Sequence, residues 1–173
     1  MICGLDISTS ITGITLLDNS GKIVYNKAWD TRKFKDFLDK AEFVRREISF
    51  LCEKYTIESI YIEQSLQSFR SGFSSAKTLS SLSRFNGIVS WLMFFYTKVK
   101  PQYLSAASAR KSCGIKVARG ENAKEKVVNF LIDSEPSFVV EYTRFGNVKP
   151  ECFDKADSIV IARAGFNCQS RES

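Results

Sequence analysis

The stretch Gly4-Leu-Asp-Ile-Ser-Thr-Ser-Ile-Thr-Gly13 decides the fold, because it places an acidic residue between two runs that are typical of β-strands. Ile2–Ile7 is a largely apolar strand that carries Asp6 near its end. Thr12–Asp18 and Lys22–Trp29 follow as two more strands, and the Asp, Asn, Ser and Gly residues between them form a turn by their chemistry. The first 29 residues therefore predict a three-strand antiparallel meander.

Helices and strands alternate after this meander. Apolar residues recur at three- and four-residue spacing from Phe34 to Tyr55, which predicts an amphipathic helix. The next strand, Glu58–Glu63, is reached through that helix, so we expect it to pair parallel with a strand of the meander. The later predicted elements are a polar loop at Ser65–Ser74, a helix at Ala76–Tyr96, a strand at Val99–Leu104, a Ser-capped helix at Ser105–Cys113, and helices at Glu121–Ile132 and Glu151–Gly165.

This order of elements predicts an α/β fold with a mixed five-stranded sheet flanked by helices. A chain of 173 residues suits a single domain. We expect that domain to span residues 1–165 and to be followed by a polar tail at 166–173 that frays.

The composition excludes several classes of chemistry. The chain has no histidine, which rules out Ser-His-Asp and Cys-His catalysis and any histidine-ligated zinc or iron. Its five cysteines are scattered without a Cys-x-x-Cys motif, so we expect reduced thiols. The sequence shows no signal peptide, and its most apolar stretch, Phe85–Thr97, is too short to span a bilayer, so we expect a cytoplasmic protein.

Four carboxylates occupy the positions that a metal site needs. Asp6 and Glu63 close two apolar strands, while Asp154 and Asp157 are three residues apart and share one face of a helix. If the two strands are neighbours, the four side chains converge and repel one another unless a cation lies between them. Mg²⁺ or Mn²⁺ suits such an all-oxygen site. Any one of these residues taken alone is more often a solvated rim residue, so the prediction rests on all four together.

Three motifs together resemble the RuvC-like Holliday-junction resolvases of the ribonuclease H superfamily. They are Gly4–Gly13, Ile60-Tyr-Ile-Glu-Gln64 and Asp154-Lys-Ala-Asp-Ser158, and their order and spacing cover most of residues 2–165. The resemblance implies a ribonuclease H-like fold and an endonuclease that cuts four-way DNA junctions with two Mg²⁺ ions, for which Mn²⁺ substitutes. The implied metal ligands are Asp6, Glu63, Asp154 and Asp157, with Asp154 at a position where some members carry histidine.

The resemblance also implies roles for basic residues and for a second copy of the chain. Arg119-Gly-Glu-Asn-Ala-Lys124 matches a family segment that places a catalytic lysine at Lys124, and a second basic residue is expected at either Arg110 or Lys111. The apolar stretch Ile88–Tyr96 matches the family's dimer helix, which implies a homodimer, while burial in the core is the alternative. The composition and length resemble a phage or viral member more than a bacterial housekeeping one.

The net charge of +6 conceals a strongly basic central segment. Residues 64–130 hold 11 basic and two acidic side chains, which gives that segment +9 and leaves −3 for the rest. A surface of one sign can hold phosphates. Our predicted DNA-binding residues, from this segment and the loops beside the carboxylates, are Ser8, Phe69, Arg70, Phe73, Arg110, Lys111, Lys116, Arg119 and Lys124. Phe69 or Phe73 would stack on bases or wedge between them, with packing on the following helix as the alternative. The resemblance implies a wedge residue in this loop, for which Leu66 and Phe69 are the candidates.

Three other functions remain open at this stage. A ribonuclease H or a transposase-like nuclease would share the metal chemistry and differ in substrate. A branched-DNA-binding module without catalysis would share the basic surface. An actin-like or sugar-kinase-type ATPase has a similar first phosphate loop but needs a second, similar domain, which 173 residues do not supply.

Overall fold

The structure, a computed structural model, describes residues 1–64 and 76–172. The described residues form one five-stranded sheet in the order β3-β2-β1-β4-β5. Its strands are β1 (Ile2–Asp6), β2 (Ile11–Leu17), β3 (Ile23–Asp30), β4 (Ser59–Glu63) and β5 (Gln102–Leu104). The first three strands pair antiparallel, and β4 and β5 add in parallel. The predicted mixed sheet with an antiparallel meander is therefore confirmed.

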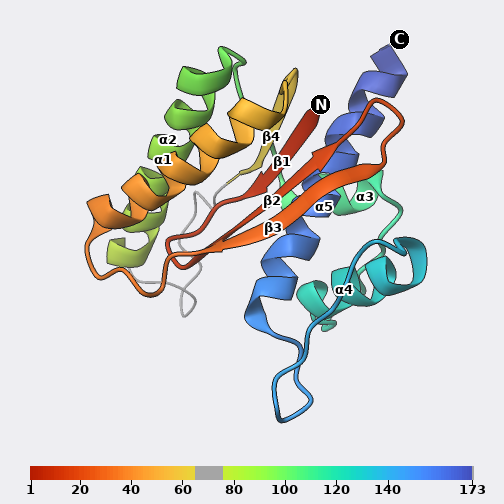
Figure 1. The fold of residues 1–173 in the computed structure, drawn as a ribbon. Coiled ribbons are helices and arrows are strands. Elements are labelled where there is room, and N and C mark those ends of the chain that lie inside the picture. Colours follow the sequence, from red (N-terminus) through yellow and green to blue (C-terminus); the bar gives the residue numbers. More distant parts are fainter. Residues whose placement is uncertain (65–75, 173) are drawn as a thin grey trace.

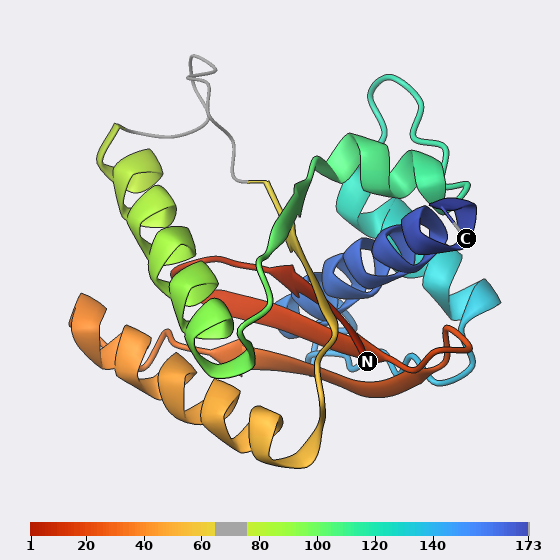
Figure 2. The ribbon, with the colours of Figure 1, turned by 90° about the horizontal axis from the view of Figure 1, so that it is seen from above.

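Helices cover both faces of the sheet (Figures 1 and 2). One face carries α1 (Phe37–Lys54) and α2 (Ala76–Thr97), and the other carries α3 (Ala106–Ser112), α4 (Ala123–Ser134) and α5 (Pro150–Glu172). Side chains of a strand alternate between faces, so Cys3 and Leu5 join the core under α1 and α2, whereas Ile2 joins the core under α5. The result is a three-layer α/β architecture.

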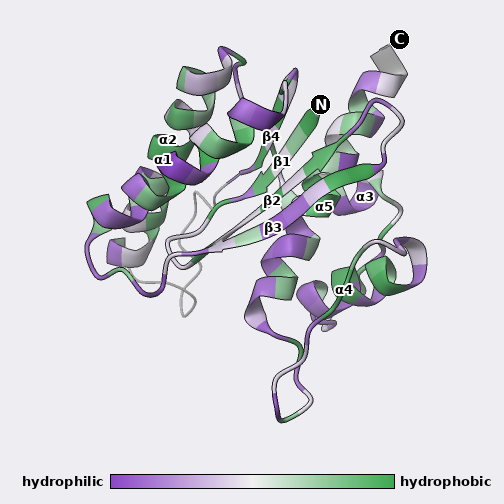
Figure 3. Ribbon diagram, in the orientation of Figure 1, coloured by the Kyte–Doolittle hydropathy of each residue, from purple (hydrophilic) through white to green (hydrophobic). Residues whose placement is uncertain are grey.

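The centre of the sheet is buried on both sides. Every residue of β2 is buried, and β1 is buried up to Asp6, whereas the edge strand β3 is largely half-exposed. Figure 3 shows the same contrast, with hydrophobic residues along β1 and hydrophilic stretches on β3. Asp6 is therefore the point where a fully buried strand meets a polar environment.

Local capping explains where the helices begin. Asp36 accepts hydrogen bonds from the backbone N–H groups of Leu38 and Asp39 and starts α1. The predicted cap Ser105 accepts from Ser108 N at 3.1 Å and starts α3. These side chains satisfy backbone donors that a helix leaves free at its N-terminus. None of the described helices combines the length and the apolar character needed to cross a membrane.

Most element bounds differ from the sequence prediction by one to three residues, and two of the differences have a clear physical cause. The fifth strand begins at Gln102 instead of Val99, because Lys98 takes a left-handed backbone conformation (φ 62°) and Pro101 has no N–H to donate to a ladder. The last helix continues to Glu172 through most of the expected fraying tail. It continues because Phe166 packs against the core and Asn167 Nδ2 donates to Ser112 O at 3.1 Å.

Candidate active site

The sheet register brings the first two carboxylates together. In the parallel pairing of β1 with β4, Leu5 lies opposite Ile62. Asp6 and Glu63, the next residues, therefore lie side by side at the carboxyl ends of neighbouring strands. Glu63 also lies opposite Leu104 of β5. The carboxyl ends of parallel strands thus meet where Asp6 and Glu63 emerge from the core, as the sequence predicts.

Two glycines of the sheet let α5 pack closely enough to bring its carboxylates, Asp154 and Asp157, towards Asp6 and Glu63. Gly13 pairs with Asp6 across β1 and β2, and a Cβ atom at Gly13 would lie 1.9 Å from the backbone oxygen of Asp154. At Gly4, a Cβ atom would lie 2.4 Å from the backbone N of Ala162. The helix therefore rests directly on the backbone of β1 and β2, which places Asp154 beside Asp6.

A buried polar network fixes the register of α5 on the sheet. The hydroxyl oxygens of Thr15 and Ser158, both fully buried, are hydrogen-bonded at 2.8 Å. Asn26 Nδ2 of β3 donates to Thr15 Oγ1 at 2.8 Å and to the backbone oxygen of Lys155 at 3.2 Å. Because Lys155 and Ser158 flank Asp157 on α5, this network sets the rotation of the helix that carries the carboxylates.

The four carboxylates share an electrostatic environment that resists ionisation. Burial, together with the charges of Glu63, Asp157 and Asp154, raises the pKa of Asp6 well above its ordinary value. Burial and the charge of Asp157 raise the pKa of Glu63 to about 7. Burial likewise raises the pKa of Asp154 to about 6 and raises the pKa of Asp157. Such mutual perturbation arises only where the groups are close and partly withdrawn from water.

Lys124 lies beside this cluster of carboxylates. Lys124 Nζ lies 3.9 Å from Asp154 Oδ1 and 3.7 Å from Asp157 Oδ2, while its side chain stays 56% exposed. Burial alone would lower the pKa of Lys124, but the neighbouring carboxylates outweigh it and raise that pKa. Asn122 caps α4 by accepting from Lys124 N at 3.1 Å and thereby holds the lysine in the first helical turn.

The two candidates for the second basic residue differ in their surroundings. The positive charge of Arg110 partly offsets the rise in the pKa of Glu63 and of Asp157, so Arg110 interacts electrostatically with the cluster. Lys111 is exposed. Both residues, with Lys116, line a hollow of about 330 Å³ between α3 and the segment that follows it.

The chemistry of the donors suits a divalent cation. When all groups are ionised, the four carboxylates carry −4 and Lys124 and Arg110 carry +2, so the net charge is −2. Carboxylate oxygens are the ligands that Mg²⁺ and Mn²⁺ prefer. As the side chains stand, no three acidic, cysteine or histidine residues in the described part of the chain lie close enough to hold a metal ion. Binding would therefore draw the carboxylates closer together.

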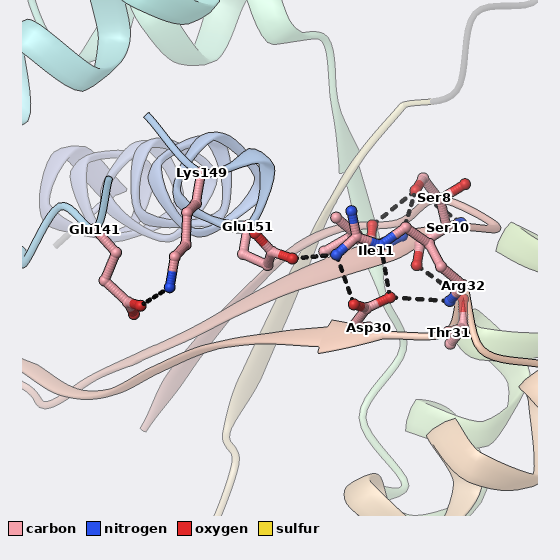
Figure 4. Close-up of polar contacts among 9 residues, drawn as sticks. All are labelled: Ser8, Ser10, Ile11, Asp30, Thr31, Arg32, Glu141, Lys149 and Glu151. Carbon is pink, nitrogen blue, oxygen red and sulfur yellow. Dashed lines mark hydrogen bonds and ion pairs between the residues drawn. The ribbon is translucent and has the colours of Figure 1, made fainter. Parts of the chain in front are cut away.

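Thr31 and Arg32, directly after β3, contact both the loop after Asp6 and the first turn of α5 (Figure 4). Arg32 donates to Asp30 through Nε at 2.9 Å and Nη2 at 2.7 Å, and Nη2 also contacts Glu151 in the first turn of α5. Thr31 Oγ1 donates to the backbone oxygens of Thr9 at 2.9 Å and of Ser10 at 3.0 Å. The segment thus ties the loop after Asp6 to the helix that carries Asp154.

The other predicted site residues lie at several places. Ser8 uses its hydroxyl within the loop after Asp6, where it donates to Ile11 O at 2.7 Å and accepts from Ile11 N at 3.0 Å. Lys116 and Arg119 are exposed in the segment between α3 and α4. The predicted loop contacts Phe69, Arg70 and Phe73, and the alternative wedge Leu66, lie outside the described residues.

Several residues that build the site are not among the predicted site residues. Gly13, Thr15 and Ser158 position α5, and Arg32 with Glu151 links that helix to the meander. A glycine inside an otherwise apolar strand is a recognised sign of close backbone approach, so Gly13 could have been found. The ion pair joins residues 119 positions apart and leaves no pattern in the sequence.

Comparison with known proteins rests on structure alone. No protein-family model matches the chain, and no curated protein sequence matches it significantly. Among solved structures, RuvC of Thermus thermophilus in complex with a Holliday junction substrate aligns with a TM-score of 0.66 and 12% identity over 97% of this chain and 94% of that one. A second T. thermophilus RuvC structure gives 0.66 and 14% over 99% and 97%.

A third similar structure is that of a yeast mitochondrial protein. The yeast mitochondrial Holliday junction resolvase Ydc2 aligns with a TM-score of 0.64 and 17% identity, over 98% of this chain and 78% of that chain. The likeness spans nearly the whole chain in all three cases. The chain therefore has the RuvC-like form of the ribonuclease H-like fold, as its three sequence motifs predict.

Proposed function

We propose that this chain is a metal-dependent endonuclease that hydrolyses phosphodiesters in branched DNA, with four-way junctions as the preferred substrate. The observation that carries the proposal is the meeting of Asp6, Glu63, Asp154 and Asp157 from β1, β4 and α5 at one edge of a RuvC-like sheet. Their mutual elevation of pKa supports a site that is completed by cations. One structural neighbour is in complex with a Holliday junction substrate and another is named a Holliday junction resolvase, and both support the choice of substrate.

Each residue has a task in this proposal. Asp6 and Glu63 from the sheet and Asp154 and Asp157 from α5 would hold two Mg²⁺ ions, with Mn²⁺ as a substitute. The ions, when bound, supply a water of lowered pKa and stabilise the leaving oxygen of the phosphodiester. Lys124, within 4 Å of both helix carboxylates, would place a point charge at the scissile phosphate. Arg110, whose charge acts on Glu63, would offset the charge that builds up in the transition state.

The DNA would enter along the basic segment. Arg110 lines a hollow together with Lys111 and Lys116, and its charge also acts on Glu63. The hollow would therefore continue the site from the carboxylates. Arg119 and Lys116 would contact phosphates further along the backbone of the DNA. Phe69, Arg70 and Phe73, in the loop after Glu63, remain predicted contacts to bases and phosphates.

The same proposal includes a homodimer through α2. The helix buries Phe85, Val89 and Met93 against the sheet, and its opposite side exposes Trp91 (58%), Phe94 and Phe95. Trp91 and Phe95 stack on each other with ring centroids 5.1 Å apart. An exposed aromatic patch of this kind supports burial by a second copy, which would set two sites against two strands of a junction.

One cleavage experiment tests the activity. Labelled four-way junction, linear duplex and RNA–DNA hybrid are incubated with the protein, with and without Mg²⁺, beside the Asp6→Asn variant. We expect Mg²⁺-dependent cutting of the junction, and we expect Asp6→Asn to bind the junction without cutting it. Preferred cutting of the hybrid would assign a ribonuclease H, and binding without any metal-dependent turnover would assign a DNA-binding module. Full activity of Asp6→Asn would overturn the proposed site.

A further inference from the structure

The segment Val139–Lys149, which joins α4 to α5, forms a hairpin that the proposed function does not use. Thr143 N donates to Asn147 O at 2.7 Å, Lys149 N donates to Glu141 O at 2.9 Å, and Tyr142 and Val148 form an antiparallel bridge. Gly146 closes the turn at φ 80°, a left-handed conformation that favours glycine. In Figure 1 the hairpin is the blue loop that extends beyond the ends of α4 and α5.

The base of this 139–149 hairpin is firmly attached to α5. Cys152 Sγ accepts a hydrogen bond from Glu141 N at 3.3 Å, and Lys155 Nζ donates to Val139 O at 3.5 Å. Lys149 Nζ and Glu141 Oε2 form an ion pair at 2.7 Å, which Figure 4 shows close to the first turn of α5. These contacts fix the orientation of the hairpin relative to α5.

The turn of the hairpin presents aromatic and basic groups to solvent. Phe145 is 74% exposed and Tyr142 is also exposed. The guanidinium of Arg144 lies 4.6 Å from the centre of the Phe145 ring. Since Glu141 and Lys149 neutralise each other, Arg144 gives the hairpin its net charge of +1. An aromatic ring backed by a guanidinium is well suited to stacking on a base beside a phosphate.

The position of the hairpin relates it to the candidate active site. It leads directly into α5, and Asp154 follows the first helical residue, Pro150, by four positions, which is about 6 Å along a helix axis. Two arms of about four residues extend the turn by about 13 Å. The aromatic turn is therefore within reach of DNA bound at the carboxylates, about six base steps from the cleaved bond at ~3.4 Å each.

We propose that the 139–149 hairpin is a second DNA-binding element, in which Phe145 stacks on an unpaired or unstacked base of the branched substrate and Arg144 binds the adjacent phosphate. This inference rests on the proposed function, because it assumes that DNA occupies the carboxylate site. A branch point offers such bases, whereas a linear duplex keeps its bases stacked. The hairpin would thus favour branched over linear DNA without touching the chemistry of cleavage.

Equilibrium binding tests the inference. Junction affinity is measured by fluorescence anisotropy in EDTA for the wild type, Phe145→Ala and Arg144→Gln. The matched control is Phe50→Ala, because Phe50 is also an exposed phenyl ring (48%) with a cation, Lys54, at 4.1 Å, but lies on α1 across the sheet. We expect Phe145→Ala to weaken junction binding at least about fivefold and Phe50→Ala to leave it unchanged.

Further measurements separate the contributions. Affinity for linear duplex should be the same for Phe145→Ala and the wild type. Arg144→Gln should lower the slope of log affinity against log salt concentration by about 0.9, the value of one phosphate contact. A 2-aminopurine base placed at the branch should be quenched by the wild type and less by Phe145→Ala. Melting temperatures equal to that of the wild type would show that both variants fold.

The outcomes are distinguishable. If the wild type neither binds nor cuts branched DNA, the proposed function fails. If the wild type binds and cuts a junction but Phe145→Ala, Arg144→Gln and Phe50→Ala all match it, only the hairpin inference fails. A change in the mass of the protein assembly in Phe145→Ala, with junction affinity intact, would assign the hairpin to a protein contact and would also overturn the inference.

Discussion

Replacing Gly13 by alanine tests whether the contact between α5 and β2 positions the candidate site. The new Cβ would lie 1.9 Å from the backbone oxygen of Asp154, whereas ordinary contact begins at 3.4 Å, so the two backbones must separate by about 1.5 Å (3.4 − 1.9). Overpacking of this kind costs about 3 kcal/mol at the upper end of its usual range. For a chain of this size, that cost corresponds to a melting temperature lower by about 6–12 °C.

The displacement acts directly on a carboxylate. It moves the backbone of Asp154 away from Asp6, and a misplacement of about 1 Å at a reacting centre reduces rates about 100-fold. We therefore expect Gly13→Ala to lose about two orders of magnitude in junction cleavage and to bind Mn²⁺ more weakly by isothermal titration calorimetry. Cleavage is measured well below the lowered melting temperature, so that unfolding does not contribute.

Gly165→Ala is the matched control. Its Cβ would lie 2.2 Å from the ring of the buried Tyr61, so it overpacks the same helix against the same sheet. Residue 165 is 11 positions beyond Asp154 on α5, which is about 16 Å along the helix. We expect Gly165→Ala to lose stability but to keep its Mn²⁺ affinity and cleavage rate. Equal losses of activity in both variants, or none in either, would refute the positioning argument.

Three further predictions follow from the site and its surroundings. Arg32→Gln should reduce cleavage and Mn²⁺ affinity by freeing the first turn of α5, whereas Arg45→Gln, which breaks a similarly exposed pair with similar geometry on α1, should do neither. Because the pKa of Glu63 is raised to about 7, its ionisation destabilises the metal-free fold as pH rises from about 4 to 7. Glu63→Gln should therefore melt at a higher temperature than the wild type at pH 8, and this difference should disappear by pH 5. Thermal scans with EDTA measure both. Trp91→Glu should convert the proposed dimer to a monomer in light scattering, and an unchanged mass would contradict the α2 interface.

The sequence was sufficient for the elements and for the meeting of the carboxylates. Strand and helix periods, the turn after β2 and the cap at Ser105 are local signals, and all agree with the structure. The helical crossover predicts that Glu58–Glu63 pairs parallel with a strand of the meander. The structure identifies that strand as β1, which brings Asp6 and Glu63 together. The later start of β5 was not predicted, because it depends on the left-handed backbone conformation of Lys98, which the spacing of apolar residues does not encode.

The remaining features depend on contacts between distant segments. The distance of α5 from the sheet is set by Gly13 and Gly4, and its rotation is set by the Thr15–Ser158 hydrogen bond. The helix was also expected to end at Gly165, but tertiary contacts of Phe166 and Asn167 extend it. Local propensity is a weak guide wherever such packing decides the outcome.

The place of α5 in the chain has a consequence for how the molecule is made. Asp6 and Asp157 are 151 residues apart (157 − 6), and α5 contacts β1, β2, β3 and β4. Contacts between such distant segments form late in folding, because the intervening chain must first be ordered. On a ribosome, the first strands emerge long before the helix that completes the acidic cluster. A nascent chain that ends before Asp154 holds only Asp6 and Glu63 of the four carboxylates, so under the proposed function it would lack the complete metal site until synthesis has passed Asp157.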